Sequence, residues 1–197
     1  HLSIRRQRQM CIRDSSNIYK AVVEENAFEV FADEALKKPL SIAEFQDNYW
    51  ISANGDSIFS KQLYYLDFKE DFVFDRHHSD LVFDIKFIEL VMPSQTNANA
   101  GQKTIAYIRY KDFVNYFKNH PDARWINFQN ISKSLTYDEA FESRLFRSVV
   151  RKFTNPDEAL IADLVDGDHP SPEMQAYLNS LAFEYKLLEF ENSLWEW

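Results

Sequence analysis

Residues 136–151 carry an apolar side chain at every fourth position, which is the spacing of one face of an α-helix. The stripe comprises Tyr137, Phe141, Leu145 and Val149. Thr136 and Glu139 stand at the spacing of a capping box, in which both side chains accept backbone N–H groups that are free at a helix start. The sequence therefore predicts a helix from Thr136 to about Arg151, preceded by a short strand at residues 123–128.

Arginines follow the same segment at three- and four-residue intervals, at Arg144, Arg147 and Arg151. On a helix they would share one outer edge near the carboxyl-terminal end, where the helix dipole favours positive charge. We expect this edge either to pair with acidic strands of the chain itself or to meet a partner. A solvated helix face is an equally good interpretation.

A period of two marks the middle of the chain. Apolar residues alternate with charged or polar ones over residues 64–74, 81–88 and 104–110, as in strands with one buried and one wet face. A turn-like stretch at residues 75–80 and a polar loop at residues 94–103 separate these segments. An antiparallel sheet is predicted.

Several further helices are predicted by their start signals. Ser41 and Glu44 form a second capping box, while Asn155 and Ser171 each precede a proline at the first helical position. The predicted ranges are 41–50, 112–119, 156–167 and 172–197, and residues 17–31 are predicted to be a helix remnant that runs into a short extended piece. The predicted fold is α+β, with an antiparallel sheet of short strands packed against several helices and a long carboxyl-terminal helix.

The last predicted helix is apolar on two faces. One stripe comprises Met174, Leu178, Leu181, Tyr185, Leu188 and Trp195, and the other comprises Phe183, Leu187, Phe190, Leu194 and Trp197. One stripe would suffice for packing within the domain, and a second left in water would be a large apolar patch. We expect the first stripe to face the chain's own core and the second to contact a partner.

The amino-terminal segment, residues 1–15, has no helical or strand period and contains four arginines and the chain's single cysteine. It resembles translated sequencing-adapter sequence, in particular the string RRQRQMCIRDS. We expect it to be a non-native tail that lies outside the fold and is dispensable for stability. Residues 16–197 are expected to form a single domain whose native amino-terminal part and export signal are missing.

Charge and composition exclude several classes of function. The formal net charge of -9 includes the four arginines of the tail, and removing those positive charges leaves about -13, which argues against nucleic-acid binding. No stretch is long and apolar enough for a membrane span. No nucleophile has plausible partners and no glycine-rich loop is present, so neither an enzyme activity nor a cofactor is expected.

One cluster of metal-ligand residue types remains, at Asp75, His77, His78 and Asp80. Imidazole and carboxylate are ordinary ligands of zinc and iron. Adjacent histidines on an extended turn point apart, however, so a solvated turn is the favoured interpretation. A small metal-dependent enzyme or binding module that uses this turn is the alternative function.

The order and spacing of several segments resemble the GldN/PorN family. The resemblance rests on residues 71–75, 81–93, 124–128, 136–150 and 188–197 and extends over nearly all of residues 18–197. It implies a non-enzymatic periplasmic subunit of a ring associated with the outer membrane in the type IX secretion and gliding-motility machinery of Bacteroidota. The implied partners are the ring lipoprotein GldK/PorK, the trans-periplasmic shaft protein GldM/PorM and further copies of the subunit itself.

Overall fold

A computed structural model of the chain describes residues 2–9, 17–50, 65–75, 77, 80–92, 103–120, 124–125, 135–146, 148–157, 159–165 and 170–194. The chain forms two compact units that are interleaved along the sequence. Unit 1 comprises residues 1–7, 68–86 and 148–197, and unit 2 comprises residues 8–67 and 87–147. The prediction of one domain over residues 16–197 stays a prediction.

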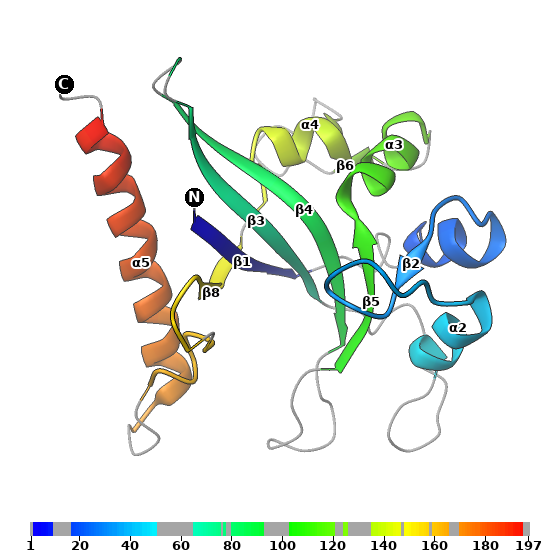
Figure 1. Cartoon of the computed structure of the whole chain (residues 1–197), viewed down its shortest axis with the longest axis horizontal. Coiled ribbons are helices and arrows are strands. Elements are labelled where there is room, and N and C mark those ends of the chain that lie inside the picture. Colours follow the sequence, from blue (N-terminus) through cyan, green and yellow to red (C-terminus); the bar gives the residue numbers. More distant parts are fainter. Residues whose placement is uncertain are drawn as a thin grey trace. The chain divides into compact units, whose positions relative to one another are not determined.

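The structure confirms the α+β class, with a sheet of six strands and a long carboxyl-terminal helix (Figure 1). The strand order is β2-β5-β4-β3-β1-β8, and β6 and β7 form a separate pair. The strands are β1 (Leu2–Gln9), β2 (Val30–Phe31), β3 (Tyr65–Asp75), β4 (Asp80–Met92), β5 (Lys103–Arg109), β6 (Arg124–Trp125), β7 (Leu135–Thr136) and β8 (Val149–Phe153). The helices are η1 (Lys20–Glu24), α2 (Ile42–Trp50), α3 (Tyr110–Asn119), α4 (Tyr137–Glu142) and α5 (Pro172–Leu194).

Unit 2 is organised around aromatic side chains from its helices. Phe113 and Phe117 of α3 are both buried and lie 4.5 Å apart, centroid to centroid. The Phe141 ring of α4 lies tilted against the Phe113 ring with centroids 6.1 Å apart, and the buried Trp125 of β6 lies 6.0 Å from Phe141. Large aromatic rings bury more apolar area than other residues, which explains how two short helices form a stable layer.

Both predicted capping boxes are present. The Thr136 hydroxyl accepts the backbone N–H of Glu139, and the Glu139 carboxylate accepts the backbone N–H of Thr136 at 2.9 Å. Ser41 and Glu44 do the same at the start of α2, and this hydrogen bonding lowers the pKa of Glu44. These local signals correctly located the amino-terminal ends of both helices.

The predicted helix of residues 136–151 is wrong beyond Glu142. Arg144 takes a left-handed conformation with φ 49°, and Leu145 donates from its backbone N–H to the carbonyl of Ala140. With a second hydrogen bond from Arg144 to Phe141, these contacts form a Schellman motif, which ends a helix. The chain then enters β8, where the β-branched Val149 and Val150 are favourable.

The basic edge therefore does not exist as one helix face. Arg144 closes α4 and lies over the Phe146 ring at 5.5 Å, whereas Arg151 lies in β8. Arg147 lies outside the described residues.

Two other expectations also differ from the structure. Residues 156–157 and 159–165 form turns rather than the predicted helix, because the Asn155 side chain binds the backbone of Ala159 through both its oxygen and its nitrogen. Residues 2–9, expected outside the fold, form β1 within the sheet, where Ile4 is buried. The expected strands at residues 64–74, 81–88 and 104–110 are confirmed as β3, β4 and β5.

The end of α4 can be tested by replacing Arg144 with glycine. A left-handed residue with a Cβ is strained by about 1 kcal/mol, so Arg144→Gly should leave the free energy of unfolding unchanged or raise it by up to about 1 kcal/mol. Glu142→Gly, inside the last helical turn, should lower it by about 0.5–1 kcal/mol. Urea denaturation of both variants provides the measurement. An equal loss of unfolding free energy in the two variants would support the longer helix predicted for residues 136–151.

Candidate partner-binding surface

The core of unit 1 lies between sheet strands and α5. Its fully buried residues are Ile4, Phe72, Val150 and Ile161, and the half-buried side chains packed against them are Phe83, Phe153, Phe183 and Leu187. Strands have a two-residue period, but β8 contributes both Val150 and Phe153, three positions apart, because the pairing of β1 with β8 shifts register between Arg5 and Arg6. β8 and α5 are neighbours in this unit (Figure 1). The inner face of α5 is therefore the face that carries Phe183 and Leu187.

This arrangement reverses the predicted roles of the two α5 stripes. Phe183 stacks on Phe153 with ring centroids 4.5 Å apart and an interplanar angle of 11°. The expectation that Phe183 and Leu187 face away from the chain's own core is wrong. Ser180 on the same side is buried, and so small a side chain lets the helix approach the strands closely. Phe190 is exposed, whereas the side chains of Leu194 and Trp197 lie outside the described residues.

The opposite face of α5 is the exposed one. We call it the outward seam, and it comprises Met174, Leu178, Leu181, Tyr185 and Leu188. Four of its members are about half or more exposed, at 58% for Met174, 49% for Leu178, 67% for Tyr185 and 53% for Leu188. Their successive spacings of four and three residues are those of a heptad seam, the pattern with which one helix packs against another. Such a row of exposed large apolar residues is typical of an interaction surface.

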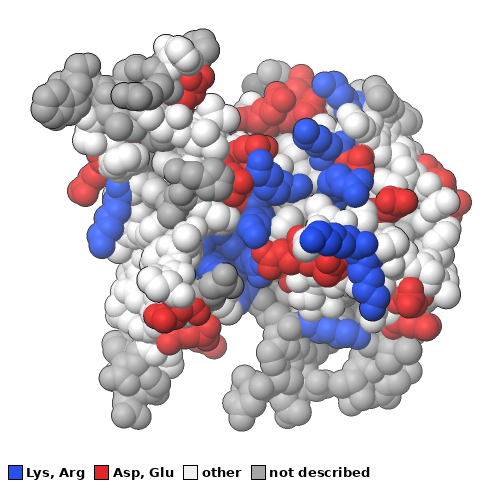
Figure 2. All heavy atoms as spheres, in the orientation of Figure 1, with Lys and Arg blue, Asp and Glu red and all other residues white. Residues whose placement is uncertain are grey.

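Acidic groups predominate beside the seam. α5 contains four glutamates, Glu173, Glu184, Glu189 and Glu191, against the single Lys186. Figure 2 shows that most of the helix surface in that view is uncharged, with isolated charged side chains. An apolar row with acidic flanks favours a partner segment whose own apolar row has basic flanks.

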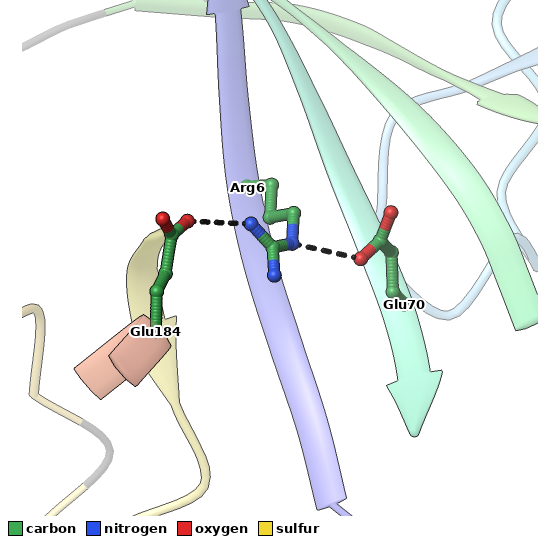
Figure 3. A network of polar contacts seen from close by, with 3 residues as sticks. All are labelled: Arg6, Glu70 and Glu184. Carbon is green, nitrogen blue, oxygen red and sulfur yellow. Dashed lines mark hydrogen bonds and ion pairs between the residues drawn. The ribbon is translucent and has the colours of Figure 1, made fainter. Parts of the chain in front are cut away.

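A buried ion-pair network lies at the edge of the unit 1 core. The Arg6 guanidinium of β1 donates from Nε to Glu70 of β3 at 3.1 Å and from Nη1 to Glu184 of α5 at 2.6 Å (Figure 3). It also lies 5.8 Å from the centroid of the Phe83 ring. The Glu70 side chain is fully buried, and a buried carboxylate needs a compensating cation. Sequence reasoning missed this network because its members are separated by 64 and 178 positions.

The turn with Asp75 and His77, which the sequence analysis weighed as a metal site, is stabilised by a local hydrogen bond. The Asp75 carboxylate accepts the backbone N–H of His77 at 2.8 Å, which is an Asx turn. His78 lies outside the described residues. Within the part of the chain that the structure describes, no three histidine, cysteine, aspartate or glutamate side chains are grouped as metal ligands.

The structure thus combines an α+β body with a row of exposed apolar residues on its carboxyl-terminal helix. Residues 15–196 match the family described as Gliding motility associated protein GldN. The chain belongs to this family. A comparison with curated proteins gives no match. None of the helices described in the structure is both long enough and apolar enough to cross a membrane.

Single substitutions can distinguish the contributions of the two α5 faces to stability. Phe183→Ala should lower the free energy of unfolding by about 2 kcal/mol, less than for a fully buried phenylalanine because the ring is half-buried. Leu188→Ala on the outward seam should change it by less than about 0.5 kcal/mol. Chemical denaturation of the two variants is the measurement. A larger loss of unfolding free energy for Leu188→Ala than for Phe183→Ala would mean that Leu188, not Phe183, faces the core, as the sequence analysis predicted.

Proposed function

We propose that the chain is a non-enzymatic structural subunit of the periplasmic ring associated with the outer membrane in the type IX secretion and gliding-motility machinery. The observation that carries this proposal is the family match over residues 15–196. In the proposed ring the subunit is periplasmic and peripheral to the outer membrane. It repeats around the ring beside the lipoprotein GldK/PorK and meets the shaft protein GldM/PorM.

The outward seam is the surface that we assign to ring assembly. Tyrosine is among the residues enriched in interface hot spots. Tyr185 is presented to solvent between Leu178 and Leu188 on one helix. The underlying Phe183 and Leu187 anchor that helix to its own strands. The helix can thus bind a partner without losing the contacts that keep unit 1 folded.

The charges beside the seam favour a partner other than a second copy of the chain. Two copies of α5 packed on each other would bring glutamates from both copies together, and Glu189 directly follows Leu188 of the seam. Like charges across a helix pair are unfavourable. We therefore assign the seam to the ring lipoprotein rather than to a second copy, and we expect basic residues on the lipoprotein surface that contacts it.

Replacing Leu178, Tyr185 and Leu188 together with serine tests the assignment. The variant should melt at the same temperature as the unsubstituted chain, because the three side chains are exposed in the isolated protein. Its affinity for the purified ring lipoprotein should fall at least about tenfold, since truncation of one hot-spot residue typically costs about 2 kcal/mol. Pull-down and titration calorimetry give the two readouts.

A matched control is available in the same unit. Val82 and Leu164 are exposed at 49% and 52% but lie outside α5, so the pair Val82→Ser and Leu164→Ser should leave binding unchanged. Equal binding by the seam variant and the unsubstituted chain would refute the assignment of the surface. Stoichiometric zinc or iron in the purified protein, removed by His77→Ala, would instead support the metal-dependent alternative.

A further inference from the structure

The outward seam is a narrow row of apolar side chains. Its members, from Met174 to Leu188, follow one another at spacings of four, three, four and three residues. The next position in this spacing is Asn192, which is polar and exposed, so the apolar row is two heptads long. At 1.5 Å per residue it extends about 21 Å along the helix. A row of this spacing and width is typical of packing against one other helix.

The residues on both flanks of the seam are acidic or uncharged. In the heptad that has Tyr185 at position a, the flanking positions e and g between residues 174 and 192 carry three glutamates, Glu184, Glu189 and Glu191, and no basic residue. Glu184 pairs with Arg6 of the chain itself, so Glu189 and Glu191 supply the charge toward the carboxyl-terminal end of the seam. Charges at these flanks determine which helices pair with each other.

The acidic flanks disfavour two other occupants of the seam. A second copy of α5 has no basic residue at either flank, so it offers no opposite charge in a parallel or in an antiparallel pair. Helices that lie on anionic membrane surfaces have lysine and arginine beside their apolar face, whereas the seam has glutamate. A helix with basic flanks matches both the apolar row and the charges.

We propose that the outward seam binds an amphipathic α-helix of a partner protein, with lysine or arginine at the positions that face Glu189 and Glu191. The apolar row of that helix packs on the seam, and the two helices form a short coiled coil. Phe183 and Leu187 remain packed on the core of unit 1, so α5 keeps its own contacts in the complex. This inference deepens the proposed function and rests on it only for the identity of the partner, the ring lipoprotein.

The direct test titrates the full chain with a labelled synthetic peptide of about three heptads. This peptide has leucine at positions a and d and lysine at positions e and g, and the lysines also keep it from pairing with itself. It should bind the chain saturably with one-to-one stoichiometry. The variant with Leu178, Tyr185 and Leu188 replaced by serine should bind it at least about tenfold more weakly.

A second peptide tests whether the occupant is a helix. It carries a central proline at position f, which breaks the helix but leaves the apolar row and the lysines unchanged. This peptide should bind the chain at least about tenfold more weakly than the first peptide. Equal binding of the two peptides would overturn the proposal, because an extended segment would then fit the seam as well as a helix.

Reversal of charge tests the role of the flanks. In the variant with Glu189→Lys and Glu191→Lys, the peptide with lysine flanks should bind at least about tenfold more weakly, and a peptide with glutamate flanks should bind better than it binds the unsubstituted chain. The matched control is Glu29→Lys with Asp157→Lys, which changes the net charge equally at two exposed positions outside α5. The control should bind the first peptide as the unsubstituted chain does, which separates the flanks from a general attraction between a basic peptide and an acidic protein.

Four further results would overturn the proposal. One is the absence of binding of the first peptide to the unsubstituted chain. Another is equal binding of that peptide by the unsubstituted chain, the triple serine variant and the charge-reversed variant. The third is dimerisation in sedimentation experiments that the serine variant loses, which would assign the seam to a second copy. The fourth is binding to vesicles of anionic phospholipid that the serine variant loses, which would assign the seam to a membrane.

A last arm replaces the peptide with the purified ring lipoprotein. The charge-reversed variant should bind the lipoprotein at least about tenfold more weakly than the unsubstituted chain and the control variant do. Equal binding by all three would overturn the assignment of the basic helix to the lipoprotein. A lipoprotein that binds none of them, beside a peptide that binds as expected, would overturn the proposed function and support the helix-binding inference.

Discussion

A helix with two apolar faces can bury only one of them against a single sheet, and this constraint determines the organisation of unit 1. In α5 the buried face is the one with Phe183 and Leu187, which pack on the core formed by the strands. The exposed face carries Met174, Leu178, Tyr185 and Leu188. Stacking of Phe183 on Phe153 and the closeness permitted by the buried Ser180 favour this orientation. The exposed apolar face is consequently a property of the folded helix itself.

The elements that sequence analysis located correctly are those defined by short-range chemistry. The capping boxes of α2 and α4 involve residues three positions apart, and the alternation in β3, β4 and β5 repeats every two residues. The end of α4 was missed because its left-handed residue is Arg144 rather than the glycine or asparagine that usually marks a helix end. The apolar stripe that continues past it belongs partly to a strand, in which Val150 faces the core.

The orientation of α5 and the network at Arg6 could not be derived from the sequence. Both α5 stripes are rich in large apolar residues, so the amphipathic pattern does not distinguish the inner face from the outer. Small residues on the inner side, Ala176 and Ser180, were the available clue, since they permit close packing. The burial of Glu70 depends on an arginine 64 positions away, and no local pattern connects the two. The sequence prediction therefore placed Phe183 and Leu187 on the outer face of the helix, whereas both side chains pack on the chain's own core.

The Arg6 network and the outward seam are physically linked through α5. Glu184 lies on the same helix as the seam, and Arg6 of β1 pairs with it at 2.6 Å. Since α5 has four glutamates and one lysine, this ion pair offsets one of the acidic groups of the helix. Tyr185, the next residue, is the most exposed member of the seam. The packing of β1 against α5 therefore also changes the charge of the helix that carries the outward seam.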